Sequence, residues 1–545
     1  MRPTIWSPPV ELSPDEQAVV KLIRRAKLFI WLREHRHELF DEEFQAELAE
    51  AYEESPVGQP PVPPAKLALA TIAQAYTSSS DDEAIECMVM DRRWQLVLDC
   101  LDATHPPFSK GTLVGFRRWL VEHDLDRRLV ERTIELADRT RGFSSRRLRA
   151  VLDSSPLWGA GRVEDTFNLL GHALRKAVSV LARQQGRGLA EVASEANAEV
   201  VAGSTSLKAA LDEDWDQPEA RDHALRVVLK ALEGIEALVA AQPPQAQDPF
   251  VRANLAVARQ VREQDVVENA EGQPTIRQGV AEDRRISVED PDMRHGRKTR
   301  SLRIDGYKRH VLTELDSDLV RGCGMTPANL PEASVGEQIE ADLASQEVTL
   351  GALYIDRAYL NSSLVQNRDP ELEIFCKAFP VRNGPKFSKL EFALDWERQE
   401  MRCPNDVVLP FMPGGTVQFP AEICAQCPLK EQCTSSPQGR SVHVHPDEQL
   451  IMELRARQQT SEGRRQLRER VKVEHVLSHV GHWQGRRGRY LGQRKNLLDL
   501  RRSATVHNLH VIARQPHERA KRPPQLVAAD ADRDVARLRV KRLIG

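Results

Sequence analysis

The 545-residue sequence has no long hydrophobic run and few aromatic residues, which make up only 5% of the chain. No apolar stretch approaches the ~18 residues that a membrane span requires. The first residues, MRPTIWSPPVELSPDEQ, lack the apolar core of a secretory signal. We therefore expect a cytoplasmic protein without a membrane partner, in which the eight cysteines do not form structural disulfides.

The chain also lacks a large net charge, and the value of -3, taken alone, argues against nucleic acid as a partner. This average conceals an uneven distribution of positive and negative charges along the chain. From Ile451 to Gly545 there are about 23 lysines and arginines against about 9 acids, roughly +14, so the first 450 residues carry about -17. Such an asymmetry indicates an anionic partner for the basic part of the chain.

What is present is the composition of a globular protein, with 41% hydrophobic and 29% charged residues. The chain is too long to fold around one ordinary hydrophobic core, so its length predicts three to four domains.

The first part of the chain is predicted to be helical. Ser13-Pro14-Asp15-Glu16 is a capping box with proline at the first helical position. A proline-rich linker at 55–64 separates the N-terminal helices, 1–54, from a second helical block at 65–142. This second block contains another capping box that begins at Ser80.

One segment of the second block, Ser109 to Glu122, has two interpretations. It is polar at its start, carries Lys110, Arg117 and Arg118, and has apolar residues at helical spacing. These features are compatible with a recognition helix that contacts DNA. They are equally compatible with an ordinary amphipathic helix of a bundle.

Strand-like runs begin near Leu148. The first ends in Asp153, two further runs at 307–315 and 319–326 flank a hairpin turn, and a buried run at 348–356 ends in Asp356. A helix at 334–344 and a last strand at 373–379 complete an α/β pattern. Between the first two runs, 157–275 reads as an all-α insertion with an acidic surface.

Four cysteines lie in one irregular segment at 380–447. Cys403, Cys424, Cys427 and Cys433 have the spacing C-x20-C-x2-C-x5-C, in which the C-x2-C pair suits half of a zinc knuckle. Four thiolates would form a closed structural Zn²⁺ site. The alternative is reduced thiols without metal.

Two aspartates at strand ends and one glutamate on a predicted helix are candidate catalytic residues. Asp153 and Asp356 end strands, where acids can converge on a ligand, and Glu474 lies one helical turn after Arg470 in a long charged helix predicted from Glu448 to about Val480. The ordinary interpretation of Arg470 and Glu474 is a surface ion pair. The functional interpretation is three carboxylates that hold two Mg²⁺ ions for phosphoryl transfer.

Basic residues surround Glu474, with aromatic residues among them and few acids. A solvated helix face would explain a charge run, but the interleaved Trp483 and Tyr490 favour a groove for a phosphate backbone. The groove would be formed by Arg464, Arg465, Arg468, Arg470, Lys472, Arg486, Arg487, Arg489, Arg494, Lys495, Arg501 and Arg502, with a second patch at Lys298, Arg300, Arg303, Lys308 and Arg309. A last helix is predicted at 497–513.

Several motifs together resemble those of bacterial insertion-sequence transposases of the DDE class, in the branch with an N-terminal helical domain and a Cys-rich insert. They are VLDSSPLWGAGRVEDTFNLLGHALRKA, DPDMRHGRKTRSLRIDGYKRHVLTELDSDLVRGCGMTPANLPEA, YIDRAYL and VEHVLSHVGHWQGRRGRYLGQRKNLLDLRRSATVHNLHVI. The resemblance covers about residues 60 to 513.

The resemblance implies an RNase H-like catalytic core with Asp153, Asp356 and Glu474 as its three acids. Members of the family often carry the spacing Y-x2-R-x3-E-x6-K around the third acid. Here Arg470 and Glu474 match, whereas Leu467 and Gly481 stand at the tyrosine and lysine positions.

The expected fold class is therefore α/β, an RNase H-like mixed-sheet core with an all-α N-terminal domain, an all-α insertion and a Cys-rich insertion. The expected divisions are N-terminal helices at 1–54, a helical DNA-binding domain at 65–142, a core built from 143–156, 276–379 and 448–513, the insertion at 157–275, a zinc insert at 380–447 and a basic tail at 514–545.

The expected activity is that of a DNA transposase, which binds terminal inverted repeats of double-stranded DNA and cleaves and transfers strands. It would work as a homodimer or larger assembly on DNA. Its expected DNA contacts are Lys308, Arg309, Arg470, Arg486, Arg487, Lys495, Arg117 and Arg118. The alternatives are a stand-alone nuclease of the same fold and a DNA-binding protein that has lost catalysis.

Overall fold

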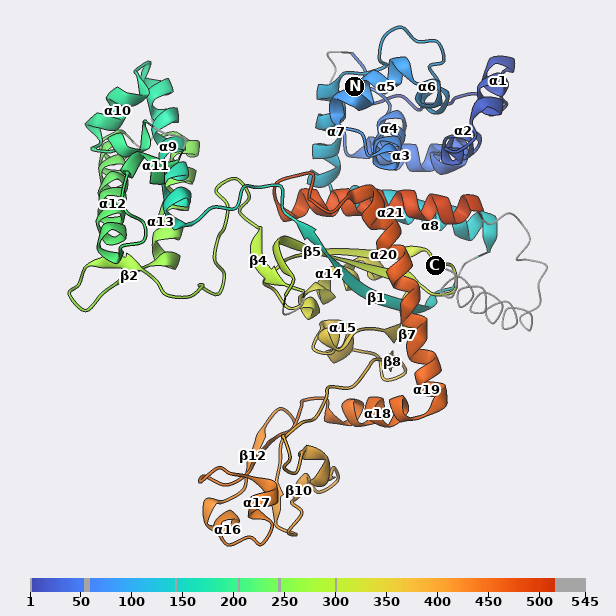
Figure 1. Cartoon of the computed structure of the whole chain (residues 1–545). Helices are drawn as coiled ribbons and strands as arrows, with labels where there is room; N and C mark the ends of the chain where they lie inside the picture. Colours follow the sequence, from blue (N-terminus) through green and yellow to red (C-terminus); the bar gives the residue numbers. More distant parts are fainter. Residues whose placement is uncertain are drawn as a thin grey trace, which may run out of the picture.

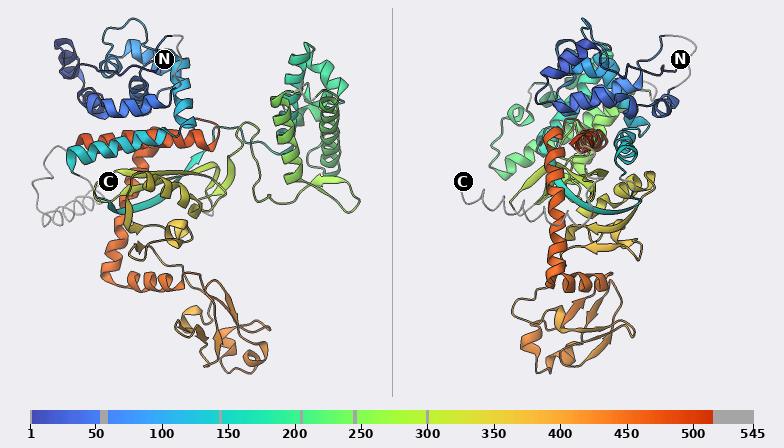
Figure 2. Two further views of the ribbon diagram at one scale, coloured as in Figure 1. Left: turned by 180° about the vertical axis from the view of Figure 1, so that it is seen from behind. Right: turned by 90° about the vertical axis from the view of Figure 1, so that its right-hand side faces the viewer.

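The computed structural model describes residues 2–52, 59–142, 145–203, 206–243, 247–298 and 301–514. Part of the expected linker at 55–64, and the expected basic tail except its first residue, lie outside these ranges. Figure 1 shows a central sheet with a long helix lying across its upper side and the N-terminal helices above that helix. A separate helical unit stands to one side of the sheet, and a small β-rich unit lies at the bottom, at the end opposite the N-terminal helices. The rear view in Figure 2 shows the same arrangement. The chain is thus a mixed α/β protein, as expected.

The N-terminal region is entirely helical. Both expected capping boxes are confirmed, at Ser13 and at Ser80, and Ser109 caps a further helix through its hydroxyl. The helices are α1 (Pro14–Leu22), α2 (Lys27–Leu39), α3 (Glu42–Glu50), α4 (Pro64–Thr77), α5 (Asp81–Met90), α6 (Arg92–Leu98), α7 (Lys110–Glu122) and α8 (Asp126–Arg141). The apolar faces of α2 to α8 form one core, whereas α1 packs with α6 in a small separate cluster.

The central sheet is mixed, with the order β4-β5-β1-β7-β8 and β6 paired to β5. β1 is antiparallel to β5 and parallel to β7, which is in turn parallel to β8. The elements are β1 (Arg147–Trp158), β4 (Arg294–Arg297), β5 (Arg303–Glu314), β6 (Val320–Pro327), α14 (Gly336–Ser345), β7 (Thr349–Tyr354), α15 (Ser363–Gln366) and β8 (Glu373–Phe375).

The predicted hairpin between residues 307 and 326 is confirmed as the β5–β6 pair. Its turn forms because the Ser317 hydroxyl donates to the Glu314 carboxylate and accepts from the Leu319 backbone N–H. Asp318 takes the left-handed backbone conformation, with φ of 62°, which aspartate tolerates better than most residues. The strand predicted at 373–379 is shorter and ends at Phe375.

The segment between β1 and β4 is mainly helical and has a core of its own. It contains α9 (Thr166–Gln185), α10 (Leu189–Glu195), α11 (Leu207–Leu211), α12 (Pro218–Ala240) and α13 (Pro249–Asp265). A small hairpin of β2 (Val266–Glu268) and β3 (Pro274–Ile276), not expected from the sequence, closes it. Figure 1 shows these helices standing to one side of the sheet.

The cysteine-containing segment also has a small core of its own, made largely of phenylalanines and valines. It consists of a three-stranded sheet, β9 (Ala393–Asp395), β10 (Glu400–Arg402) and β11 (Val408–Pro410), a hairpin of β12 (Thr416–Gln418) and β13 (Ser441–His443), and the short helices α16 (Ala421–Ala425) and α17 (Lys430–Cys433).

The prediction of one continuous helix from Glu448 to about Val480 is wrong. The segment is divided into α18 (Glu448–Gln459), α19 (Ser461–Gln466), a 3-10 turn (Leu467–Arg470) and α20 (Val471–Gln484). Thr460 is extended and caps α19 through its hydroxyl. Gly463 permits the tight bend, because a Cβ there would lie 1.9 Å from the Arg457 carbonyl oxygen.

The last described helix, α21 (Gln493–Arg514), confirms the helix predicted at 497–513. It is buried along most of its length because it lies between two cores. Leu498, Val506 and Leu509 pack with the N-terminal helices, whereas Leu500 and Ala504 pack with the sheet and α20. Among the helices that the structure describes, none combines the length and apolar character needed to cross a membrane.

Candidate active site

A cleft of about 870 Å³ opens where β1, the end of β7 and α20 meet. Asp153, Asp356 and Glu474 all line it, although they are far apart in the sequence. The structure therefore brings the three predicted acids to one cavity.

The sheet register explains why the two aspartates meet. In the parallel β1–β7 pair, Val151 lies opposite Tyr354, and each aspartate follows two positions later. β1 itself continues to Trp158, contrary to the prediction that the first strand ends in Asp153, but its pairing with β7 stops at Val151, so both aspartates lie just beyond the end of the parallel pair. Ligands commonly bind beyond the carboxyl ends of parallel strands. Asp153 is 8% exposed, and its Oδ1 accepts the Ser154 N–H at 2.8 Å.

Glu474 reaches the cleft from α20. Val473, Val476 and Val480 turn toward the core and fix this helix on the sheet. The opposite stripe, at intervals of three and four residues, presents Arg470, Glu474, Ser478 and Gly481 to the cleft. Glu474 itself is exposed.

Arg470 lies between the two aspartates. Its Nη1 donates to Asp356 Oδ2 at 3.1 Å and its Nη2 to Asp153 Oδ2 at 2.8 Å. Burial by itself would lower the pKa of Arg470, but the charges of Asp153 and Asp356 outweigh burial and raise this pKa above its usual value. The guanidinium thus occupies the place where a cation would neutralise both carboxylates.

The three acids line one cleft, but they do not form a metal site in the described part of the chain. In that part, no group of three or more His, Cys, Asp or Glu side chains is arranged so that it could hold a metal ion. At the cleft, Asp153 and Asp356 are paired with the Arg470 guanidinium instead.

A fourth carboxylate, Glu332, also lines the cleft, and the sequence analysis missed it. Ser154 Oγ donates to Glu332 Oε1 at 2.8 Å, and Lys298 Nζ donates to the Ser154 carbonyl oxygen at 3.0 Å and lies 3.5 Å from the same Glu332 oxygen. Glu332 falls in the TPANLPEA motif, but no local pattern indicated that it faces Ser154.

Four of the predicted DNA contacts lie on the surface. Arg118, Arg486, Arg487 and Lys495 are exposed, and only Arg486 of these lines the cleft. Arg487 donates to the carbonyl oxygens of Gly159 and Ala160, which ties it to the end of β1.

Three other predicted DNA contacts are buried, contrary to the expectation of a surface patch. Arg117 donates to Gln74 and Asp81 inside the N-terminal helices. Lys308 donates to the Leu330 carbonyl oxygen, and burial lowers its pKa. Arg309 is 6% exposed, although its side chain borders the cleft.

The arginines of α21 likewise differ from the expected open groove. Arg501 and Arg502 are 6% and 3% exposed. Arg501 pairs with Asp126 and Asp342, and Arg502 with Asp499. Their charges are neutralised inside the protein, so they do not belong to an exposed phosphate-binding groove.

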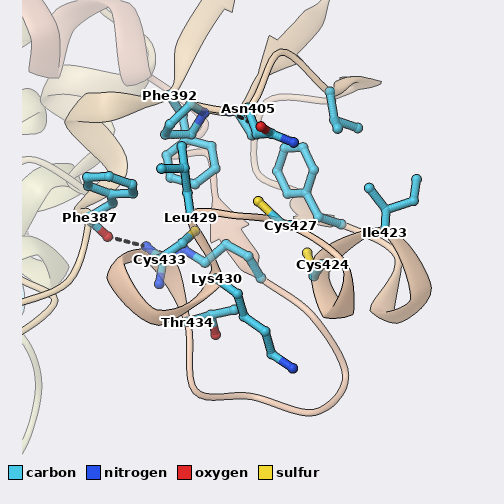
Figure 3. Close-up of a pocket in the computed structure, with 15 residues that line it drawn as sticks. Phe387, Phe392, Asn405, Ile423, Cys424, Cys427, Leu429, Lys430, Cys433 and Thr434 are labelled. Atoms are coloured by element: carbon cyan, nitrogen blue, oxygen red, sulfur yellow. Dashed lines mark hydrogen bonds between the residues drawn. The ribbon is translucent and has the colours of Figure 1, made fainter.

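The four clustered cysteines surround one small apolar cavity of about 30 Å³. Figure 3 shows Cys424, Cys427 and Cys433 around it together with Phe392 and Leu429. Burial raises the pKa of Cys433, Arg440 lowers it, and the three other cysteines raise it. The Asn405 N–H donates to Cys403 Sγ at 3.4 Å. All four thiols are free, and zinc binding stays a prediction.

Comparison with known protein families gives two matches. A model described as a transposase DDE domain matches residues 414–513, and a model described as a transposase domain, DUF772, matches residues 31–119. No match was found among curated proteins or among solved structures.

The first match includes α20 with Glu474 and all of α21 except its last residue. The second begins within α2 and ends within α7, and it includes α4, which packs against α21. The resemblance of this chain to the DDE-class transposases of insertion sequences is thereby confirmed by two separate regions of its sequence.

Proposed function

We propose that this protein is a DNA transposase that binds the terminal inverted repeats of an insertion sequence and catalyses metal-dependent strand cleavage and strand transfer. The observation that carries the proposal is the convergence of Asp153, Asp356 and Glu474 on one cleft in a chain with two transposase matches.

We assign the core to the RNase H-like class. The support is the placement of the first acid on β1 and the second directly after the adjacent parallel strand, β7, with the third acid on a late helix. The helices at 65–142 and the units at 157–275 and 380–447 are then additions to this core.

The donor set of the cleft fits Mg²⁺, which prefers hard oxygen ligands. Asp153, Asp356 and Glu474 would hold two Mg²⁺ ions. These ions would replace the Arg470 guanidinium, which compensates the charges of Asp153 and Asp356 in the structure. When bound, the metal would activate the attacking oxygen and stabilise the leaving oxygen.

The residues of the chain would orient the DNA for this reaction. Arg470, released from the aspartates, would lie within reach of a phosphate oxygen, and its planar guanidinium suits two-point contact with an oxyanion. The Arg309, Arg486 and Lys298 side chains around the same cleft add positive charge for the backbone on either side.

The proposed partner is double-stranded DNA, first the element ends and then the target. Because both ends must be processed together, the proposal includes a dimer or larger assembly on DNA. Arg118, Arg487 and Lys495 are exposed outside the cleft and are further proposed contacts of the DNA.

A structural zinc ion in the Cys-rich unit is a further part of the proposal. Its support is the chemistry of four thiols that line one cavity, because thiolates are the usual ligands of structural Zn²⁺. In the described structure these four side chains are not arranged as a metal site, so the proposal requires them to move together when zinc binds. Metal analysis of purified protein should give about one zinc per chain. A zinc content near zero in protein purified without chelator would contradict this assignment.

The deciding experiment incubates the protein with Mg²⁺ and labelled DNA that carries the inverted repeats flanking the gene. Cleavage at the repeat ends followed by joining to a second DNA supports the transposase. Cleavage without joining would replace it with a nuclease, and binding without either reaction would replace it with a DNA-binding protein that has lost catalysis.

A further inference from the structure

Nearly every buried arginine in the described part of the chain has a carboxylate partner within ion-pair distance, as expected from the cost of burying an unpaired charge. The pairs are Arg33–Glu16, Arg36–Asp99, Arg117–Asp81, Arg132–Asp41, Arg294–Asp283, Arg321–Glu314, Arg501–Asp126 and Arg502–Asp499. Two buried arginines, Arg285 and Arg309, do not follow this rule.

Arg285 uses all of its nitrogens. It donates to the carbonyl oxygens of Ser287 and Val288 and to the side chain of Gln260, so each nitrogen of the guanidinium has an acceptor. It does not line the catalytic cleft. Arg285 holds a loop in place, and its guanidinium has all its hydrogen-bond acceptors without a ligand.

Arg309 has a different environment. Nε donates to Ser155 Oγ at 2.7 Å, and Nη1 donates to Gln484 Oε1 at 3.1 Å and to the Gly485 carbonyl oxygen at 2.9 Å. These acceptors are all neutral. Burial lowers the pKa of Arg309 to about 10, and the charge of Asp499, which pairs with Arg502 instead, only partly offsets that effect.

The remaining nitrogen of Arg309, Nη2, lies against Gly481 of α20. A Cβ at position 481 would come within 2.8 Å of Nη2, so any side chain there would crowd the guanidinium. None of the described residues accepts a hydrogen bond from Nη2, and both Arg309 and Gly481 line the catalytic cleft. A donor with a positive charge is therefore held at the wall of the cleft without an anion.

We propose that Arg309, left accessible by Gly481, is a binding site for one phosphate of the DNA backbone beside the three acids. This inference rests on DNA being the substrate of the cleft. A phosphodiester oxyanion supplies the negative charge that Arg309 lacks, in a charge-assisted hydrogen bond to Nη2.

The position of this site relative to the acids follows from the sheet. Arg309 is fixed to Ser155, which lies opposite it in the β1–β5 register and follows Asp153 by two residues on the same face of β1. One strand repeat of two residues spans about 6.6 Å. The phosphate held by Arg309 would thus neighbour the phosphate at the carboxylates and fix the path of the strand.

Arg470 does not replace Arg309 in this role while it pairs with the aspartates. Its two terminal nitrogens are engaged by Asp153 and Asp356, whereas Arg309 has no carboxylate partner among the described residues. The two arginines are consequently distinct: one compensates the acids, and the other lacks an anion.

The test measures binding of a labelled duplex of arbitrary sequence without metal, at several KCl concentrations, for three variants. Arg309→Gln removes the charge, Gly481→Ala places a methyl group against Nη2, and Arg285→Gln is the matched control. For the first two we expect affinity about 10- to 100-fold weaker at low salt and a salt slope smaller by about 0.9, the loss of one phosphate contact.

Arg285→Gln should leave both affinity and slope unchanged. Gly481→Ala keeps the proposal testable if Arg309→Gln does not fold, because alanine favours a helix over glycine. An unchanged slope in a folded Gly481→Ala variant and in any folded Arg309→Gln variant would overturn the phosphate site.

The outcome is separable from that of the proposed function, because this assay contains neither repeat sequence nor Mg²⁺. A reduced slope together with absent repeat cleavage would keep the phosphate site and reject the transposase. Repeat cleavage together with an unchanged slope would do the reverse.

Discussion

Two regions of this protein are rich in arginine and aspartate, yet they use these residues differently. At the α21 interface, Arg494 and Arg501 contact Asp124 and Asp126, and Arg501 also contacts Asp342, at 2.6–3.3 Å. In the cleft along α20, Arg470 spans Asp153 and Asp356, whereas the exposed Arg486 has no carboxylate partner among the described residues.

The difference lies in solvent access and in the balance of charge. Asp126 is 1% and Arg501 6% exposed, so that pair is fixed in the low-dielectric interior where separation is costly. Glu474 and Arg486 are exposed at an open cleft where ligands can enter. Charges of the first kind join the N-terminal helices to the rest of the protein, and charges of the second kind are open to solvent at the cleft.

The largest effect should come from the acids of the cleft. We expect Asp153→Asn and Asp356→Asn to reduce repeat-end cleavage by at least about 1,000-fold, because each removes several kcal/mol of metal-dependent stabilisation of the transition state. The measurement is single-turnover cleavage of labelled DNA, with DNA binding as a second readout that changes little. Asp316→Asn, at the exposed β5–β6 turn, is the matched control and should cleave normally. Cleavage within tenfold of wild type in Asp153→Asn would remove this residue from the site.

At the α21 interface, Arg501→Met should reduce the free energy of unfolding by about 3–5 kcal/mol, because it leaves Asp126 and Asp342 buried without their partner. Urea unfolding at pH 7 measures this change. Arg486→Met, at the exposed cleft, should change stability by less than about 0.5 kcal/mol. Equal effects of the two substitutions would abolish the distinction between the regions.

Acid should act on the α21 interface as well. The pKa of His507 is lowered to about 4, chiefly by burial and also by the charges of His479 and Arg514, while the hydrogen bond to the Asp318 backbone opposes this shift. Because the folded pKa lies below the unfolded value of about 6.5, the unfolded state binds more protons between these values. Stability is therefore full above pH 6.5 and falls as the pH drops toward 4.

For a shift of this size the loss is on the order of 3 kcal/mol. His507→Gln should flatten the decline of the melting temperature between pH 6.5 and 4, measured by circular dichroism. His482→Gln, an exposed residue of the cleft, is the matched control and should follow the wild-type profile. A wild-type decline in His507→Gln would assign the acid sensitivity to other groups, such as buried His310, whose pKa burial lowers to about 3.

The sequence was sufficient for features set by local pattern. The apolar run that precedes Asp356 predicts the end of β7 to within two residues, whereas the prediction that the first strand ends in Asp153 is wrong, because β1 continues to Trp158 in its pairing with β5. Ser13, Ser80 and Ser109 cap helices because their hydroxyls accept nearby backbone N–H groups. The roles of these residues are local, and nearby residues reveal them.

The sequence was insufficient where a charge depends on a distant partner. The run of arginines after Glu474 gave no indication that Arg501 meets Asp342 or that Arg502 meets Asp499 in the interior. Glu332 was overlooked because its partner, Ser154, lies 178 positions away. The division of α18, α19 and α20 depends on Gly463 approaching Arg457, a contact that helical periodicity does not contain.

The smallest expected effect concerns the exposed cleft, the second of the two regions compared above. Arg486 lines the cleft, is exposed and has no carboxylate partner in the described part of the chain, so Arg486→Gln should leave folding intact. If it contacts one phosphate, the slope of log affinity against log salt should fall by about 0.9. Arg146→Gln, an exposed arginine near Glu347 at the other end of β1, is the matched control. An unchanged slope for Arg486→Gln, measured by fluorescence anisotropy, would confine the phosphate contacts of the cleft to its buried wall and would make exposure alone a poor guide to which arginines bind DNA.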